Sequence, residues 1–413
     1  MTENQIVNSH FRPHVFLRSY NLRLSALQWF FWSGFGAVNG FLVAYLNNAG
    51  FDSLQVGFVL ALFAGFAIIG QPAWGYFSDY TGRLIVTLLL TLAGGLLSLV
   101  IFYTFGRQNY VSILIATALF GFCLEPTTAL IDTLTYKIMD HGQPINYGLT
   151  RAMGSVGFAI TMALTGIILD AIGIIHMYAI SFGMLSIALI VTFLILKDSR
   201  FVEHAKSYRF TSNTERKPIS LLIKNKEISV FLIVNFLIFT AFRAAVIYMP
   251  LLIIELGGTN QHIGVASGVM AVSEVPVLIL STYLIKKFGD QTILLWSFGF
   301  FTLRIFLHLL VSSAWGVVFV QAAQGLSFGL YLPASVHFMY RVSPAGYKAT
   351  AQALSVAVSF GLASVSGSFL GSLIISTTGI VSMYGYAGFL GMFSTLLYFA
   401  ITKHKKGGLA KGT

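Results

Sequence analysis

Charge and cysteine are what this 413-residue chain has least of. Only 9% of its residues are Asp, Glu, Lys or Arg, whereas 56% are hydrophobic. A soluble globule of this size needs more polar surface than that, so the composition indicates an integral membrane protein. Cys123 is the single cysteine, which excludes an intrachain disulfide and a cysteine-based metal cluster.

The sequence also lacks the short motifs of common enzymes. Its polar segments carry no His/Asp/Glu metal spacing, no nucleophile elbow and no phosphate-binding loop. We therefore expect neither an enzyme nor a bound metal or other cofactor. The longest polar segment, Lys197 to Lys226, is too short for the signalling domain of a receptor.

Apolar runs long enough to cross ~30 Å of hydrocarbon as helices recur along the whole chain. They predict an all-α membrane protein with twelve transmembrane helices in two six-helix bundles. We place the N-terminal bundle at residues 1–196, a cytoplasmic linker at 197–227 and the C-terminal bundle at 228–413. The predicted spans are 24–47, 54–77, 85–105, 110–136, 148–170, 174–196, 228–254, 261–286, 291–312, 315–341, 347–374 and 380–402.

Most of the 25 Lys and Arg residues lie in the two tails, the long linker and every second short loop. By the positive-inside rule, this pattern predicts that both termini are cytoplasmic and that the chain crosses the cell (inner) membrane many times. The net charge of +11 then faces the anionic head groups of the lipid bilayer rather than nucleic acid.

Ionisable residues inside the apolar spans are the anomaly of the sequence. Glu125 and Asp132 lie seven residues apart, hence on one helix face and ~10 Å apart along the axis, while Arg151 lies one turn into the next span. A charge at the bilayer centre costs roughly 2.5–3.5 kcal/mol on insertion scales, so such groups pair or line a wet cavity. We expect Asp132 to pair with Arg151; the alternative is that Arg151 extends to the membrane surface.

The second half of the chain carries its own intramembrane charges. Glu274 and Arg304 each lie about thirteen residues from the start of their spans, so we expect them to meet near the midplane. Arg243 is placed toward the non-cytoplasmic side. Three acids then balance three arginines, which fits an internal paired network. The alternative for Glu274 and Arg304 is a static ion pair between two helices.

The most specific local signal is GQPAWGYFSDYTGRL, where Gly75, Asp79, Gly82 and Arg83 match the pattern G-x-x-x-D-x-x-G-R. That pattern lies between the second and third helices of the major facilitator superfamily. A carboxylate at a helix end can pair with a base or with the positive end of another helix, which suits a conformational latch. The alternative is a simple tight turn.

The chain resembles the major facilitator superfamily over nearly its whole length, and in detail its lactose permease and nucleoside or oligosaccharide proton symporter branch. The resemblance rests on GQPAWGYFSD at 70–79, on TALIDTL and YGLTRAMGSVGFA in the fourth and fifth helices, on Glu274 and on LRIF around Arg304. It implies proton-driven uptake of a small polar solute, such as a sugar, oligosaccharide or nucleoside, by alternating access in a functional monomer. The alternative is a proton-driven exporter of amphipathic compounds.

The resemblance also implies roles for single residues. In lactose permease an acid of helix 4, an arginine of helix 5 and an acid of helix 8 bind sugar. These correspond to Asp132 or Glu125, to Arg151 and to Glu274. The helix 9 arginine, here Arg304, belongs to the proton-coupling group.

Two departures change the expected site. Phe158 stands where the permease has a tryptophan that stacks on galactose, and Gln324 and Ser327 stand where it has a histidine and the proton-carrying glutamate. Proton coupling must then use another acid, which we predict to be Glu274 with Arg304 as its gate, and Glu125 as the runner-up. The predicted solute-binding residues are Asn39, Glu125, Asp132, Arg151, Phe158 and Glu274.

Overall fold

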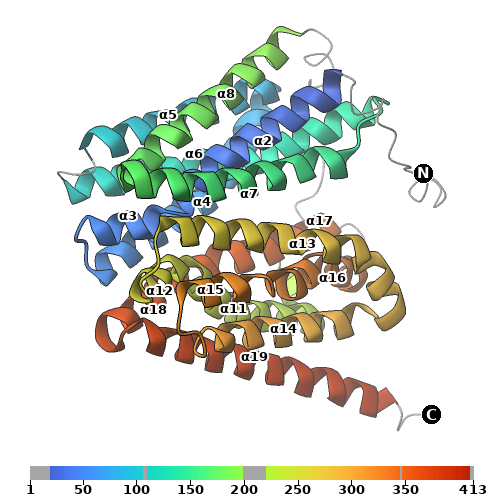
Figure 1. Cartoon of the computed structure of the whole chain (residues 1–413). Helices are drawn as coiled ribbons and strands as arrows, with labels where there is room; N and C mark the ends of the chain where they lie inside the picture. Colours follow the sequence, from blue (N-terminus) through green and yellow to red (C-terminus); the bar gives the residue numbers. More distant parts are fainter. Residues whose placement is uncertain (1–18, 106–108, 199–219, 345–346, 410–413) are drawn as a thin grey trace.

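The computed structural model describes residues 19–105, 109–198, 220–344 and 347–409, and these are almost entirely helical (Figure 1). In a bilayer every backbone N–H and C=O must be satisfied without water, and a helix does this within one segment. Eleven helices in the described part are long and apolar enough to cross a membrane.

The N-terminal half forms six helical runs that match the first six predicted spans. Polar caps mark three of the starts, because the side chains of Asp52, Asn109 and Asn146 accept hydrogen bonds from the first turns of the helices that follow them. The elements are α2 (Ser19–Asn39) with α3 (Leu42–Asn48), α4 (Ser53–Thr81), α5 (Leu84–Phe105), α6 (Tyr110–Asp140), α7 (Tyr147–Ile172), and the 3₁₀ turn η2 (Ile174–His176) with α8 (Met177–Lys197).

The C-terminal half forms six further runs, so the prediction of an all-α fold with twelve helices is confirmed. The ninth, α14, is not among the eleven; it has only 18 residues, and these include Asp290, Gln291 and Arg304. The elements are α10 (Ser220–Lys224), α11 (Lys226–Ile247) with α12 (Met249–Glu255), α13 (Asn260–Phe288), α14 (Asp290–Leu307), α15 (Ala314–Gln321) with η3 (Gly325–Gly329) and α16 (Leu330–Val342), α17 (Lys348–Val356) with η4 (Ala357–Leu362) and α18 (Ala363–Thr378), and α19 (Ile380–Leu409).

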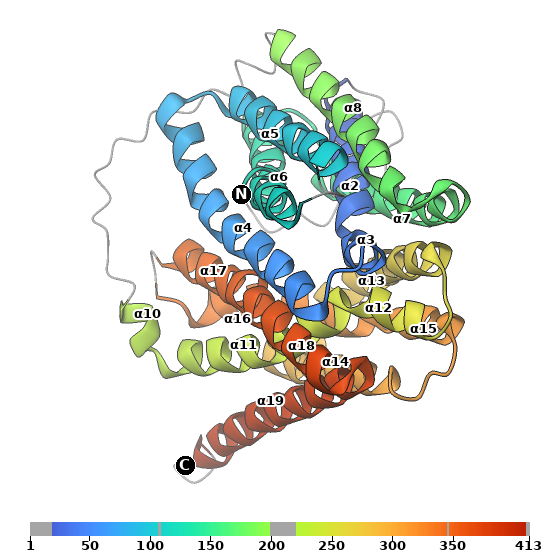
Figure 2. The same cartoon turned by 90° about the vertical axis from the view of Figure 1, so that its left-hand side faces the viewer.

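Two bundles lie side by side, the N-terminal one above the C-terminal one in Figure 1. Both described chain ends, Ser19 and Leu409, lie on the right in that view, and we call this end the terminal face. The opposite end carries Asp170 at the end of α7, and we call it the Asp170 face; Figure 2 looks onto it. The bundles meet along two helix pairs, α7 with α13 and α4 with α18.

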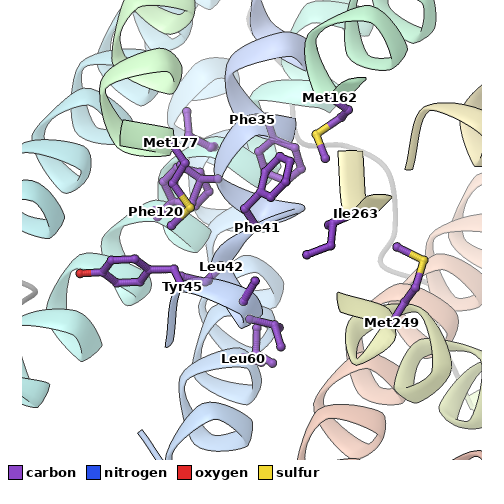
Figure 3. Close-up of a cluster of buried hydrophobic side chains, with 14 of the residues drawn as sticks. Phe35, Phe41, Leu42, Tyr45, Leu60, Phe120, Met162, Met177, Met249 and Ile263 are labelled. Carbon is purple, nitrogen blue, oxygen red and sulfur yellow. The ribbon is translucent and has the colours of Figure 1, made fainter. Parts of the chain in front are cut away.

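An apolar cluster joins the bundles near the Asp170 face (Figure 3). Met162 of α7 belongs to the N-terminal bundle, whereas Met249 and Ile263 belong to the C-terminal one, and all three are buried. Burial of such side chains stabilises the contact by roughly 25 cal/mol per Å² of apolar surface that leaves water. The cluster therefore favours a state in which this face is closed.

Glycines bring the backbones of the two bundles together on the same side. A Cβ atom at Gly264 of α13 would collide with the carbonyl oxygen of Met162 in α7, and one at Gly166 of α7 would collide with that of Asn260. A Cβ at Gly57 of α4 would strike Ser372 of α18. Small residues at helix crossings permit this close approach.

Candidate functional site

A cavity of about 150 Å³ lies between the two bundles and is lined by both. Three of the predicted solute-binding residues, Asn39, Glu125 and Phe158, line it from the N-terminal bundle. The C-terminal bundle contributes Arg243 of α11 and Phe360, which lies in the π-helical segment η4. Single-turn π segments in helices are frequent at functional sites.

Glu125 and Arg243 carry opposite charges on opposite sides of this interface. The two side chains lie within range of a favourable electrostatic interaction with each other. The Arg243 guanidinium lies 4.8 Å above the centre of the Phe360 ring, and its Nε has no hydrogen-bond partner among the described residues. Protein encloses both side chains, and the surface that they retain borders the cavity.

Sequence reasoning missed Arg243 as a site residue, because depth along a helix does not say which way a side chain points. Its one available signal was the arginine itself inside an apolar span. The structure groups it with Glu125, which the sequence had left without a cationic partner.

Asp132 and Arg151 lie within electrostatic range of each other, but among the described residues no ion pair within 4.0 Å joins them, and the hydrogen bonds of Asp132 lead to α2. Gln28 Nε2 donates to Asp132 Oδ1 over 3.1 Å, and Trp32 Nε1 donates to Gln28 Oε1 over 3.0 Å. The Arg151 guanidinium lies 4.5 Å above the Trp32 ring. Two neutral side chains of α2 thus stand between the acid of α6 and the arginine of α7.

Glu274 and Arg304 are also joined through a glutamine. Gln324 Nε2 donates to Glu274 Oε1 over 2.9 Å, and Arg304 donates to Gln324 Oε1 and to Gln321 Oε1. His308 Nδ1 donates to the Arg304 carbonyl oxygen over 2.8 Å, so its Nε2 accepts from Gln321 Nε2 over 3.1 Å. Gln324 was noted in the sequence only as a departure, yet it connects the two predicted coupling residues.

The motif residues Gly75, Asp79, Gly82 and Arg83 lie at the end of α4 on the terminal face. Gly82 adopts φ +65°, a left-handed conformation that ends the helix without steric cost. Asp79 and Arg83 are exposed, and Asp79 lies within electrostatic range of Lys137 in α6. The latch role stays a prediction.

Asp170 joins the two bundles at the opposite face. Its Oδ1 accepts hydrogen bonds from the backbone N and from Nδ2 of Asn260, and its Oδ2 accepts one from the backbone N of Gln261, each over 2.9 Å. This carboxylate of α7 therefore caps α13 of the other bundle. Sequence reasoning missed it, because an acid at a span end looks like an ordinary surface residue.

The interface helices α4 and α13 are more exposed near the terminal face than near the Asp170 face. On α13 five of the six buried residues lie between Ile263 and Gly268, and Ser281 is the sixth; Ile279 and Tyr283 nearer the terminal face are 75% and 61% exposed. On α4, Tyr76 and Tyr80 are 71% and 74% exposed. In this structure the cavity is closed toward the Asp170 face.

Comparison with known proteins identifies the family. The model of the MFS_1 like family matches residues 21–386. The chain belongs to this family, within the major facilitator superfamily. It is a multi-pass membrane protein and a secondary transporter of this type, not an enzyme.

Two curated relatives match over most of their length. The maltose permease of Geobacillus stearothermophilus is 28% identical over 374 residues, covering 90% of this chain and 92% of the relative. The uncharacterized transporter YwbF of Bacillus subtilis (strain 168) is 26% identical over 389 residues, covering 92% and 94%. Among solved structures, the nucleoside transporter NupG (D323A mutant) aligns with a TM-score of 0.81 at 16% identity, covering 93% of this chain and 99% of that one. The predicted superfamily is confirmed.

Proposed function

We propose that this protein takes up a small polar solute, a sugar, oligosaccharide or nucleoside, together with protons. It works as a monomer in the cell (inner) membrane with both termini in the cytoplasm. The observation that carries the proposal is the cavity between the bundles, which holds an acid from one bundle and an arginine from the other. A solute site at the interface of two helix bundles suits alternating access by rocking.

With cytoplasmic termini, the Asp170 face is extracellular and the structure is an inward-facing state. Uptake then requires the contacts of Asp170 and the glycine crossings to part while the terminal face closes. The two arrangements are states of one equilibrium, and solute binding shifts their populations by its different affinity for each.

Proton coupling is assigned to Glu274. As a carboxylate it accepts the hydrogen bond from Gln324, which also accepts from Arg304. Protonation removes the negative charge that Gln324 and the nearby guanidiniums of Arg304 and Arg151 stabilise. Because Arg151 belongs to the other bundle, a proton on Glu274 changes the attraction between the bundles.

The names of two similar proteins support the solute class. One relative is a maltose permease, and the structural neighbour NupG is a nucleoside transporter. A neutral polar solute also suits a cavity in which one acid and one arginine balance in charge.

The test uses purified protein in liposomes with an imposed inward proton gradient and radiolabelled maltose, glucose, uridine and adenosine. We expect uphill accumulation of at least one of them. Glu274→Gln should keep exchange at equal concentrations yet lose that accumulation. The control is Glu255→Gln, an exposed acid at the end of α12 outside the cavity.

Three outcomes would change the assignment. Uphill accumulation retained by Glu274→Gln would move the coupling role to Glu125. Extrusion of amphipathic dyes against their gradient, without uptake of any sugar or nucleoside, would favour the exporter. Accumulation without any proton gradient would contradict proton coupling.

A further inference from the structure

Arg243 is a partly buried cation that the protein leaves incompletely satisfied. Its Nε finds no acceptor among the described residues, although the guanidinium is enclosed by protein. A charged donor without an acceptor inside a membrane protein is costly, because neither water nor lipid compensates it there. The cation–π contact with Phe360 fixes the plane of the guanidinium but supplies no hydrogen-bond acceptor.

Glu125 is the complementary group on the other side of the cavity. It comes from α6 and Arg243 from α11, so each bundle contributes one charge. The two attract one another, yet they form no ion pair within 4.0 Å in the described part of the chain. Both groups line the same cavity, so a bound molecule can bridge them.

The rest of the lining describes what that molecule must offer. The cavity has four neutral hydrogen-bonding side chains, Asn39, Ser267, Ser364 and Ser368. Its aromatic walls include Phe158 from one bundle and Phe360 from the other. A sugar ring matches this combination, since its C–H faces pack on aromatic rings while its hydroxyl groups point outward in its own plane.

A hydroxyl group also suits the two charges better than any single ion does. It can donate to the Glu125 carboxylate while its oxygen, or that of a neighbouring hydroxyl, accepts from Arg243. A net cation or net anion would leave one of the two charges without compensation. The cavity volume of about 150 Å³ limits the enclosed part to a single ring.

We propose that Arg243 is a specificity-determining residue of the solute site, where it binds a hydroxyl oxygen of one neutral polyhydroxylated ring whose other hydroxyl groups donate to Glu125. The inference rests on the proposed transport function and deepens it by naming the recognised group. A zwitterion, with its carboxylate at Arg243 and its ammonium at Glu125, is the competing solute. The neutral serine and asparagine side chains and the aromatic walls favour the polyol.

The first experiment measures equilibrium binding to the purified full-length protein by calorimetry. The probes are maltose, methyl α-glucoside and uridine as polyols, and dialanine as the zwitterion. Arg243→Gln should weaken binding of the polyol that the wild type binds by roughly ten- to a hundredfold, as expected for a lost hydrogen bond to a charged group. The affinity of Arg243→Lys for the polyol should lie between those of the wild type and Arg243→Gln, because lysine keeps the charge but lacks the planar guanidinium with its several N–H donors. The matched control, Lys226→Gln, removes an exposed cation at the start of the same helix and should bind normally.

A second experiment uses the wild-type protein and therefore does not depend on the folding of a variant. Phenylglyoxal reacts with arginine, and mass spectrometry reports modification at each position. The bound polyol should protect Arg243 from modification severalfold and should leave Arg341, which is half-exposed outside the cavity, unprotected.

The outcomes separate this inference from the proposed function. Normal polyol binding by folded Arg243→Gln, or modification of Arg243 that a saturating polyol does not slow, would overturn the role of Arg243 while leaving transport intact. Binding and protection by dialanine but by no polyol would overturn the solute class. Binding of none of the four probes by the wild type would overturn both.

Discussion

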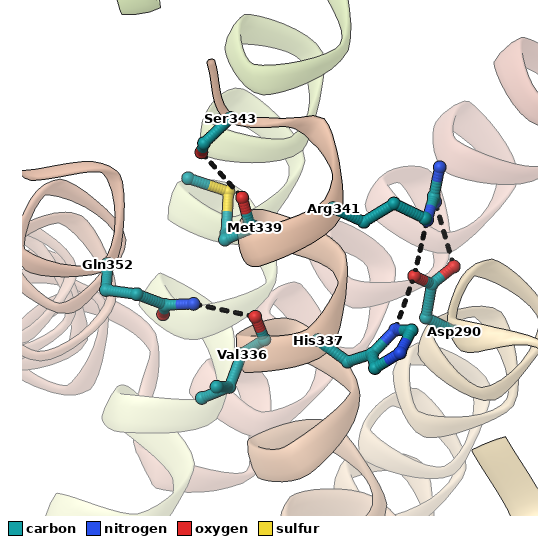
Figure 4. A network of polar contacts seen from close by, with 7 residues as sticks. All are labelled: Asp290, Val336, His337, Met339, Arg341, Ser343 and Gln352. Carbon is teal, nitrogen blue, oxygen red and sulfur yellow. Dashed lines mark hydrogen bonds and ion pairs between the residues drawn. The ribbon is translucent and has the colours of Figure 1, made fainter. Parts of the chain in front are cut away.

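The two faces of the molecule are held by different contacts. At the Asp170 face the bundles touch each other, through the carboxylate of Asp170 on Asn260 and through backbone contacts at Gly264. At the terminal face the ion pairs of the described residues stay within one bundle. Arg341 pairs with Asp290 in the C-terminal bundle (Figure 4), and Arg23 pairs with Asp198 in the N-terminal one.

This difference indicates which contacts break during transport. Ion pairs inside a bundle keep it rigid and do not oppose rocking, whereas contacts between bundles set the balance between the open and the closed state. We therefore expect the contacts at the Asp170 face to control the conformational equilibrium, and the terminal face to close when they part. Substitutions at the two faces should consequently have different effects.

The largest effect is expected for Gly264→Val. The added side chain meets the backbone of Met162 in α7, which cannot move aside, so the Asp170 face should not close and net transport should be lost. A cysteine introduced at Asn48 in a Cys123→Ser background reports on that face through its reaction with a membrane-impermeant maleimide. Gly183→Val is the control. Nothing lies within 4 Å of a Cβ atom at this position, so this variant should transport at the wild-type rate. Full transport by Gly264→Val would contradict the closure described here.

Asp170→Ala should have the next largest effect. It removes three hydrogen bonds to α13 and should shift the population toward an open Asp170 face by about tenfold, since exposed charge-assisted bonds contribute on the order of 1–2 kcal/mol together. The same maleimide reaction measures the shift. Asp52→Ala is a matched control, because Asp52 lies at the same face but caps its own helix α4. Equal labelling rates for Asp170→Ala and Asp52→Ala would show that Asp170 does not hold the two bundles together at this face.

Asp79→Asn should have a smaller effect, confined to turnover. Asp79 is exposed and lies far from the cavity, at the end of α4 on the terminal face. If it latches the terminal face in the alternate state, the variant should exchange solute several times more slowly while its equilibrium affinity stays within about twofold. A large loss of binding would show that Asp79 is not a latch residue.

Asp290→Asn should affect stability rather than transport. Burial alone would raise the pKa of the Asp290 carboxyl, but hydrogen bonds from Arg341 and His337 and the charge of Arg341 outweigh it and hold the pKa below its usual range. A carboxyl with a depressed pKa stabilises the fold above its unfolded pKa, and this contribution is lost as the pH falls through the folded value.

Thermal unfolding in detergent tests this contribution. The variant should be about 1 kcal/mol less stable at pH 7, a modest figure because Arg341 is half-exposed. The difference should begin to shrink as the pH falls below about 4, the ordinary pKa of an aspartate, and should vanish once the pH is below the depressed folded pKa. A difference that persists unchanged at low pH would show that Asp290 acts through packing and not through its charge.

The sequence predicted the helices well because the signals for them are local. Apolar runs set the spans, and caps such as Asp52 and Asn146 mark where helices begin. The rule for intramembrane charges likewise predicted Glu125 as a site residue, since an acid inside the membrane is costly whichever way its helix is rotated about its axis.

The partners of these charges could not be predicted, because they depend on rotation of each helix about its own axis. Helices that are apolar all round show no preferred inward face. The sequence therefore did not reveal that Gln28 lies beside Asp132, or that Arg243 lies beside Glu125, more than 100 positions away in each case. Glutamines such as Gln324 are neutral and do not stand out as costly residues in a span.

The most direct test of alternating access is a pair of distance measurements by electron paramagnetic resonance in lipid nanodiscs. In the Cys123→Ser background, spin labels at Asn48 and Glu255 report on the Asp170 face, and labels at Asp140 and Lys287 report on the terminal face. When pH is lowered or the transported solute is added, we expect the first distance distribution to shift to longer values as the second shifts to shorter ones. Distributions that move in the same direction, or that stay unchanged at saturating solute, would contradict rocking of the two bundles about the Glu125–Arg243 cavity.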